Sequence, residues 1–236
     1  ELERLGYRYV QGASGDPSDW VLRQVTDEQK GFEWKGQADY DQVGDAAAAY
    51  IQSQLVELCK LSPLPLPLES GADAHTAVYG SEDLQQHTGP MLLLVCGAPP
   101  GGAAGVWGRS LCINSTLQEG AMFDYIFRAQ RLGWSVLIAN PNVDEVSGLK
   151  VPGSECPHAH LRTLWKAYVE PSAASKVLVV AHSYGASATA HLLKTEASAM
   201  ERICAVAFTD AWASPPGTLL QEVAPPEGAE GPEFLQ

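Results

Sequence analysis

Four short apolar runs constrain the fold of this chain more than any other sequence feature. They are rich in Val, Leu and Ile and do not alternate with polar residues: Met91–Cys96, Trp134–Ala139, Val177–Ala181 and Ile203–Phe208. Strands buried on both faces of a parallel sheet have this composition. Helix-like stretches separate the runs, and such alternation implies right-handed crossovers. The sequence therefore predicts an α/β fold with a doubly wound, mostly parallel sheet and helices on both faces.

Local signals place the helices between these strands. Thr116–Glu119 is a capping box that begins a helix, and Gly133 is placed to end it. Pro157 suits the first turn of the next helix, which stops at Pro171. A third helix is predicted from Gly185 to about Met200.

The N-terminal part differs from this core. We expect one domain over residues 1–213, with N-terminal strands and a helix in 1–70 and the core sheet in 76–213. Tyr7–Val10 and Gly31–Trp34 are predicted to form an antiparallel edge of the sheet.

Two further segments complete the expected organisation. Asp41–Leu61 is Ala-rich and amphipathic, which predicts a helix, and Pro63, Pro65 and Pro67 predict an extended connector after it. Residues 214–236 are rich in Pro, Gly and Glu and contain no basic residue, which predicts a flexible acidic tail.

Charge and composition limit the function classes. The formal net charge is −13 with only 15 Lys and Arg among 236 residues, so direct nucleic-acid binding is not expected. A nucleic-acid role would run through protein partners. No apolar run reaches the roughly 18 residues of a membrane helix, and the charged N-terminus leads into no signal-peptide pattern. The five irregularly spaced cysteines favour reduced thiols in cytosol or nucleus.

The stretch from Val177 to Ala188 carries the sharpest motif. A buried strand runs into Ala181-His-Ser183-Tyr-Gly185 and then into a helix. This small-x-Ser-x-Gly pattern is typical of the nucleophile elbow of α/β-hydrolases, in which a strained turn projects the serine above the sheet. The residues two before and two after the serine must be small because the turn brings them close together. A loop serine that caps the following helix is the structural alternative.

A Gly-rich loop after the first apolar run is the second element of the predicted site. In hydrolases of this type the loop supplies one oxyanion N–H and the residue after the nucleophile supplies the other. Gly97 begins this loop, and Ala98 and Tyr184 would be the donors. A phosphate-binding loop does not fit, because no Lys-Ser/Thr follows and Pro99 and Pro100 have no amide proton.

The acid and the base are harder to assign. Asp210 follows the last apolar run, a suitable place for the acid, but no histidine follows it as the usual order of the triad requires. His160, at the start of the helix before the motif strand, is the candidate base, with His158 less favoured. The alternatives are a base on a C-terminal segment absent from the chain, or a site without catalysis. Cys156, His158 and His160 do not make a convincing metal site, and no cofactor is expected.

Several stretches in order along the chain resemble the argonaute-binding-protein domain family. They are Leu5–Tyr7, Tyr79–Glu82, Gly105–Trp107, Ile138–Asn142, His160 with Trp165, Val179–Gly185 and Ala205–Asp210. The resemblance implies an α/β-hydrolase-like fold and protein partners such as Argonaute, chromatin or histone-deacetylase complexes. Animal members of the family are called cotranscriptional regulators, which implies a nuclear or cytoplasmic location.

The chain departs from this family in two places. Cys96 replaces the histidine usual before Gly97, and the chain ends before the C-terminal strand and late histidine that members carry. Two functions follow as expectations: an acyl hydrolase acting on esters, thioesters or amides through Ser183, or a non-catalytic scaffold in silencing or chromatin complexes. Fold alone does not choose between them.

Overall fold

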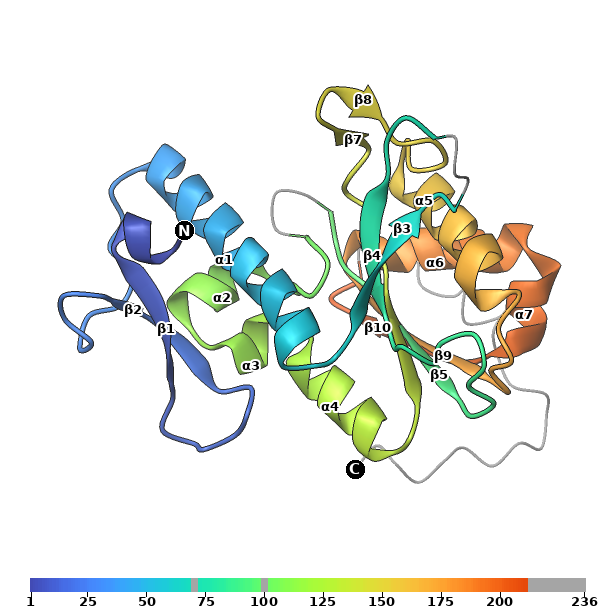
Figure 1. The fold of residues 1–236 in the computed structure, drawn as a ribbon, viewed down its shortest axis with the longest axis horizontal. Coiled ribbons are helices and arrows are strands. Elements are labelled where there is room, and N and C mark those ends of the chain that lie inside the picture. The colour runs from blue at the N-terminus through green and yellow to red at the C-terminus, as the bar shows by residue number, and fades with distance from the viewer. Residues whose placement is uncertain (69–71, 99–101, 212–236) are drawn as a thin grey trace.

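A six-stranded sheet forms the centre of the molecule (Figure 1). The computed structural model describes residues 1–68, 72–98 and 102–211. The strand order is β10–β9–β5–β6–β4–β3, and the strands are β3 (Ser62–Leu66), β4 (Thr76–Gly80), β5 (Met91–Val95), β6 (Ser135–Ile138), β9 (Val177–His182) and β10 (Ile203–Thr209). β10, β9, β5 and β6 are parallel, while β4 pairs antiparallel with β6 and β3. The four apolar runs are the four parallel strands, as predicted.

Helices cover both faces of this sheet, which confirms the doubly wound architecture. One side carries α1 (Gln37–Glu57), α2 (Arg109–Asn114), α3 (Leu117–Gly120) and α4 (Phe123–Arg131). The other carries α5 (Pro157–Leu164), its π-helical continuation η2 (Trp165–Val169), α6 (Tyr184–Thr195) and α7 (Ala197–Arg202). Successive residues of β5 face opposite cores, because strand side chains alternate: Leu92 and Leu94 pack with α1 and α4, and Leu93 packs with Trp165.

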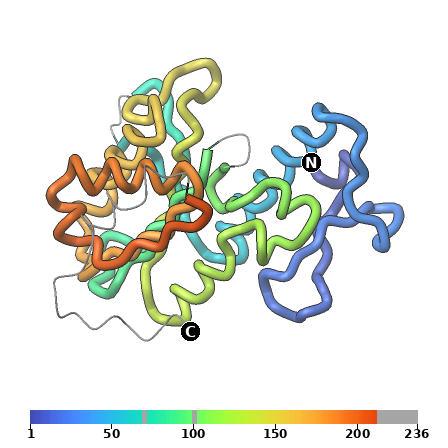
Figure 2. Tube along the Cα trace, turned by 180° about the vertical axis from the view of Figure 1, so that it is seen from behind, coloured from blue at the N-terminus to red at the C-terminus, as the bar shows by residue number. Residues whose placement is uncertain are grey.

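The prediction of an antiparallel edge from the N-terminal segments is wrong in its pairing. β1 (Tyr7–Gln11), which follows the 3-10 turn η1 (Glu3–Leu5), pairs with β2 (Trp20–Gln24) in a separate two-stranded ribbon, and residues 31–34 form no strand. The ribbon lies beyond α1 and α2, away from the central sheet (Figures 1 and 2). Tyr7 and Leu22 are buried in the same apolar cluster as residues of α1 and α2, which no local sequence pattern specifies.

The Pro-rich connector is part of the sheet. Pro63 and Pro65 lie in β3, opposite Tyr79 and Ala77 of β4. A proline has no N–H for a sheet, so it is tolerated on an edge strand, and β3 is the edge of this sheet.

Most local helix signals act as expected. Thr116 Oγ1 accepts a hydrogen bond from Glu119 N at 3.1 Å, but the capping box begins only the single turn α3, and α4 is a separate helix that ends before Gly133. Pro157 occupies the first turn of α5. The last predicted helix is broken at Glu196 into α6 and α7.

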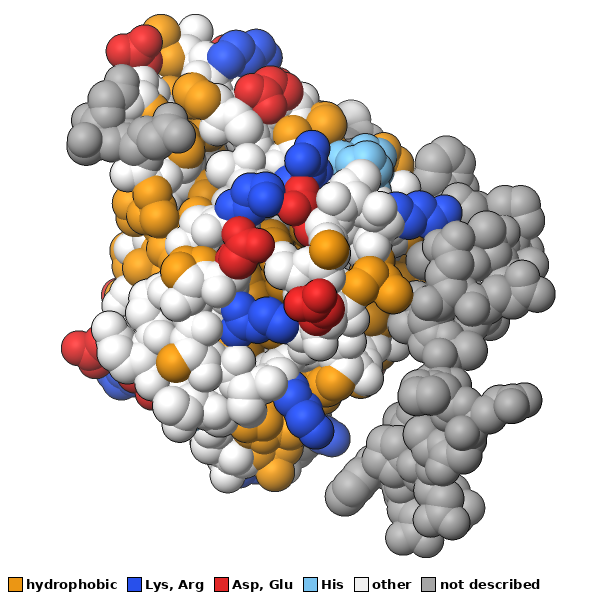
Figure 3. Space-filling model, turned by 90° about the vertical axis from the view of Figure 1, so that its right-hand side faces the viewer, with side chains coloured by type: hydrophobic (Ala, Val, Ile, Leu, Met, Phe, Trp, Pro, Cys, Tyr) orange, Lys and Arg blue, Asp and Glu red, His pale blue; other side chains and the backbone are white. Residues whose placement is uncertain are grey.

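Glu196 lies at this break with two cations. Arg162 Nε and Lys166 Nζ each lie 2.8 Å from its carboxylate oxygens. Basic and acidic side chains are interspersed on this face of the molecule (Figure 3). A short hairpin, β7 (Glu145–Val146) with β8 (Leu149–Lys150), precedes α5.

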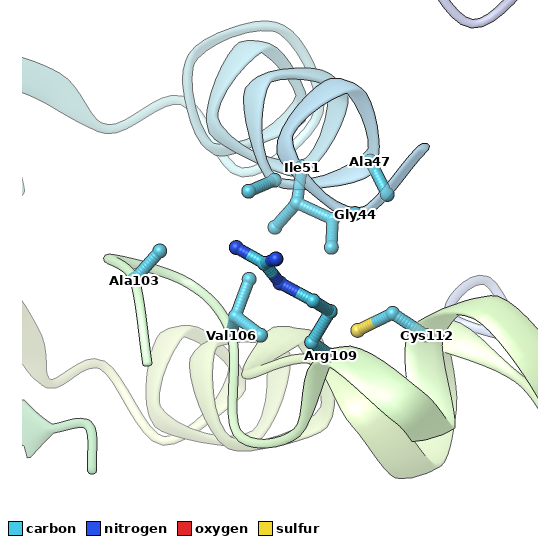
Figure 4. A pocket seen from close by; sticks show the side chains of 8 residues that line it. Gly44, Ala47, Ile51, Ala103, Val106, Arg109 and Cys112 are labelled. Carbon is cyan, nitrogen blue, oxygen red and sulfur yellow. The ribbon is translucent and has the colours of Figure 1, made fainter. Parts of the chain in front are cut away.

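Arg109 of α2 forms ion pairs with two aspartates of α1. Its guanidinium binds Asp45 at 2.7 Å and Asp41 at 3.3 Å, and its stem crosses Gly44, where a Cβ would lie 2.5 Å from Arg109 Cδ (Figure 4). The space left in this pocket is about 10 Å³, no more than one water needs, so it holds no ligand.

Candidate functional site

The carboxyl ends of the four parallel strands meet at one edge of the sheet. The segments that leave this edge include Gly97 after β5, Asn142 after β6, Ser183 after β9 and Asp210 after β10. Ligands of open α/β sheets bind at this edge, because the loops that follow parallel strands converge there. Of the six residues proposed from sequence, Ser183 and Asp210 follow strands of this edge directly, and Gly97 lies two residues after β5.

Ser183 occupies a strand-to-helix turn with an unusual backbone. It lies between β9 and α6 with φ 52 and ψ −120, outside the regions that non-glycine residues normally adopt. Such a conformation costs on the order of 1–3 kcal/mol and persists where the surroundings impose it. The turn and its strain are those that the motif predicts.

Small residues on both sides of Ser183 make this turn possible. A Cβ at Gly185 would lie 2.6 Å from Cys96 O and 2.8 Å from Val95 O, so α6 starts in backbone contact with β5. Ala181 is fully buried on β9. The motif requires small residues here because α6 crosses β5 at this distance.

The loop after β5 lies against the serine. A Cβ at Gly97 would lie 2.9 Å from Ser183 Cβ and 3.4 Å from Ser183 Oγ. The structure thus brings Gly97 and Ser183 together, although they are far apart in sequence. Ala98 is exposed next to Gly97, and Tyr184 begins α6. Pro99 and Pro100 lie outside the described residues.

Asn142 holds this loop, a role that the sequence reasoning missed. Its Nδ2 donates hydrogen bonds to Gly97 O at 2.7 Å and to Gly102 O at 2.8 Å. The signal was present in the stretch Ile138–Asn142, which carries the family resemblance without an assigned chemical role.

His160 lies in the protein interior rather than beside Ser183. Asn140 N donates to His160 Nε2 at 3.1 Å, so the proton of a neutral ring is on Nδ1 and is donated to Ser154 Oγ at 2.8 Å. Ser154 Oγ in turn donates to Val143 O at 3.0 Å. Burial lowers the pKa of His160 from its usual 6.5 to about 3. Both ring nitrogens are used in this network, so the expectation that His160 serves as the base receives no support from its contacts.

None of the other candidate groups that the structure describes is hydrogen-bonded to the Ser183 hydroxyl. Within the described part of the chain, no hydrogen bond joins Ser183 Oγ to another residue. The Asp210 side chain also makes none there; this residue is exposed, and its backbone has φ 45. His182 is directed elsewhere: its Nδ1 lies 3.1 Å from Thr209 Oγ1, and its ring packs on Trp107. The described residues therefore contain a serine in a strained turn without an assembled acid–base pair.

The histidines of α5 and α6 form a small cluster near the turn. The His158 and His191 rings are 4.8 Å apart, and His158 Nε2 lies 3.3 Å from Ser187 Oγ. Burial and the neighbouring His191 lower the pKa of His158. In the described ranges, no group of three or more His, Cys, Asp or Glu side chains is placed to hold a metal ion.

The cysteines are free thiols in the structure. Burial raises the pKa of Cys59, Cys96 and Cys112 to about 12, so these thiols are unreactive near neutral pH. Cys96 occupies the position before Gly97 as a buried apolar residue. Among the helices that the structure describes, none is long and apolar enough to cross a membrane.

The strain at Ser183 has a measurable consequence. Ser183→Gly is expected to be more stable than Ser183→Ala by about 1 kcal/mol, because only glycine removes the Cβ that disfavours φ 52. Urea unfolding of both variants measures this difference. Ser187→Gly and Ser187→Ala, inside α6, form the matched pair and are expected in the opposite order, with alanine more stable by roughly 0.5–1 kcal/mol. The same order at both positions would argue against strain at Ser183.

Comparison with known proteins agrees with these features. The Arb2 domain family matches residues 17–144 and 143–218. A FAM172 family protein homolog of Caenorhabditis elegans is 32% identical over 95% of this chain and 69% of its own length. The cotranscriptional regulator ARB2A homolog of Dictyostelium discoideum is 26% identical over 89% of this chain and 60% of its own length.

More distant relatives and a solved structure are also similar. The human cotranscriptional regulator ARB2A is 23% identical over 79% of this chain and 58% of its own length. The chain thus spans about three fifths of the length of these regulators. A histone deacetylase from Saccharomyces cerevisiae aligns with a TM-score of 0.47 and 11% identity over 71% of this chain and 68% of that chain. The family match covers most of the sequence, and this chain belongs to the Arb2 domain family.

Proposed function

We propose that this chain is a protein-binding module of a cotranscriptional regulator and that it does not turn over substrate by itself. The observation that carries the proposal is the isolation of Ser183. A serine hydroxyl is a poor nucleophile until a neighbouring base removes its proton. The Ser183 hydroxyl has no hydrogen-bonded partner in the described residues, and His160 uses both ring nitrogens elsewhere.

The partners are expected to be proteins. The family resemblance points to Argonaute proteins and to chromatin or histone-deacetylase complexes, and the name cotranscriptional regulator, carried by several relatives, supports a nuclear role. A net charge of −13 opposes direct binding to a nucleic-acid backbone, so association with RNA would be indirect.

Reactivity and binding test the proposal together. Wild type and Ser183→Ala are expected to hydrolyse p-nitrophenyl acetate within about twofold of each other, because no general base contributes its usual ~10²–10⁴-fold. Both are expected to bind a purified Argonaute protein with equal affinity in a fluorescence titration. Rapid hydrolysis that Ser183→Ala abolishes would contradict the non-catalytic role, and absence of Argonaute binding would exclude that partner.

The second candidate function is an acyl hydrolase, and the geometry of the turn favours it. Stable folds avoid a strained non-glycine residue unless function requires it, and Ser183 lies against Gly97 as an oxyanion loop would demand. Ser183 would attack an ester, thioester or amide carbonyl, and the Ala98 and Tyr184 amides would hold the oxyanion. Asp210 would be the acid, and the base would come from outside the described residues. Covalent labelling by a fluorophosphonate that Ser183→Ala abolishes would support it.

A further inference from the structure

The segment Asn140–Asn142 after β6 has polar side chains that core packing does not explain. A side-chain amide has two N–H donors, and Asn142 uses both on the loop after β5, at Gly97 O and Gly102 O. These two carbonyls belong to the described residues on either side of 99–101, so one side chain joins Gly97 to Gly102.

The hydrogen bond to Gly97 O orients more than that carbonyl. The peptide unit is planar and trans, so the carbonyl of Gly97 and the N–H of Ala98 lie in one plane and point in opposite directions. Holding Gly97 O on Asn142 therefore directs the Ala98 N–H away from Asn142. Ala98 N–H is the donor that the second candidate function assigns to the oxyanion, and its peptide begins at the residue that contacts Ser183.

Asn140, two residues before Asn142, is held by hydrogen bonds of its own. Asn140 is buried, its Nδ2 donates to Ala77 O at 3.1 Å, and its Oδ1 accepts from Ala104 N at 3.3 Å. Asn140 thus ties β6 to β4 and to the segment after the loop. A residue that positions a functional group needs such a second layer of hydrogen bonds.

Asn142 is also costly for stability alone. Its Oδ1 is buried and accepts no hydrogen bond from the residues that the structure describes. A buried acceptor without a partner costs on the order of 1–3 kcal/mol. The two hydrogen bonds that Asn142 Nδ2 donates, to Gly97 O and Gly102 O, offset this cost.

We propose that Asn142 is a positioning residue that sets the direction of the Ala98 N–H by holding the Gly97 and Gly102 carbonyls across the loop from Ser183. This role for Asn142 rests on the acyl-hydrolase candidate, because only in that function is the Ala98 N–H an oxyanion donor. The two hydrogen bonds from Asn142 Nδ2 to Gly97 O and Gly102 O, here called the clamp, can be measured without any reaction.

Asn142→Asp tests the clamp with almost no change of shape. An ionised carboxylate has no donor and faces two carbonyl oxygens, so the loop is expected to open locally. The Gly102 amide, which donates to Ala98 O at 3.1 Å, reports on this opening by hydrogen exchange. The exchange rate of the Gly102 amide is expected to rise about tenfold or more, because lowering the free energy of local opening by about 1.4 kcal/mol gives that factor. The control is Asn114→Asp, the same substitution on the exposed face of α2, which is expected to leave Gly102 exchange unchanged.

The pH dependence separates positioning from general destabilisation. The two carbonyls raise the pKa of the introduced carboxyl, and its protonated form has one donor again. The exchange difference between Asn142→Asp and wild type, corrected for intrinsic exchange, is therefore expected to shrink as the pH falls through that pKa. Unchanged Gly102 exchange in Asn142→Asp, or a difference independent of pH, would overturn the proposal.

Fluorophosphonate labelling links the clamp to Ser183. If Ser183 of the wild-type protein is labelled, Asn142→Asp is expected to slow labelling about 100-fold, as a misplaced reacting group does, at a temperature where both proteins are fully folded. Equal labelling rates would show that Asn142 does not act on the site. If wild type is not labelled, the hydrolase candidate fails, and Gly102 exchange alone decides whether Asn142 holds the loop.

Discussion

Acidification is expected to destabilise this protein by about 3 kcal/mol between about pH 6.5 and pH 4 through His160 alone. The folded-state pKa of this ring is lowered to about 3 from an unfolded value of 6.5, so the unfolded chain binds the proton first. The stability that depends on a neutral ring is complete above the unfolded pKa and is lost as the pH falls toward the folded one. Protonation at Nε2 would also place an N–H against the N–H of Asn140.

Urea unfolding across this pH range measures the effect. Carboxylates add their own pH dependence, so the comparison is with His160→Gln, which lacks the titrating ring and is expected to lose about 3 kcal/mol less over the same range. His191→Gln removes a less buried histidine of α6 and serves as the matched control. Equal pH slopes for wild type and His160→Gln would show that the ring is not held neutral.

Gly185→Ala is expected to destabilise the fold by about 3 kcal/mol, the upper part of the usual range for overpacking. The added Cβ would lie 2.6 Å from Cys96 O and 2.8 Å from Val95 O, and neither backbone carbonyl can move without distorting β5. Helix propensity alone would favour alanine by up to about 1 kcal/mol. The steric term is larger, so the sign of the effect is destabilising.

The matched control is Gly108→Ala. The three atoms nearest to a Cβ there all belong to the Leu111 side chain, the closest at 3.4 Å, an ordinary contact. We expect this variant to remain within about 0.5 kcal/mol of wild type in urea unfolding. If Gly185→Ala were as stable as Gly108→Ala, the close crossing of α6 over β5 would not hold in solution.

The strands β5, β6 and β9 were predictable because they are largely buried on both faces, and β10 has the same apolar composition although it is an edge strand that is at least partly exposed along its length. Short runs composed almost entirely of apolar residues are typical of such strands. The prediction failed at residues 31–34 because their pattern is only local. The actual partner of β1 is β2, and Tyr7 and Leu22 of these two strands are buried in one apolar cluster. The prolines predict a connector where β3 lies, because proline is avoided inside sheets; β3 is an edge strand, where proline is tolerated.

The candidate site also has one part that the sequence predicts and one part that it does not. The turn at Ser183 was readable from sequence, since small residues two positions before and after a serine have a steric meaning that is local. The surroundings of His160 were not readable, because a helix N-terminus near a sheet edge is compatible with an exposed or a buried ring. Its contacts with Ser154 and Asn140 come from loops packed in three dimensions.

The sequence by itself determined the four parallel strands, the turn at Ser183 and the need for glycine at position 185, because each follows from burial or sterics within a short segment. Only the tertiary structure decided that Gly97 lies on Ser183, that Asn142 closes the loop after β5, and that His160 is a neutral structural ring. The physical reason is that a hydrogen bond between side chain and backbone depends on distances of a few tenths of an ångström. Those distances are set by how helices and loops pack on the sheet, which no local pattern encodes.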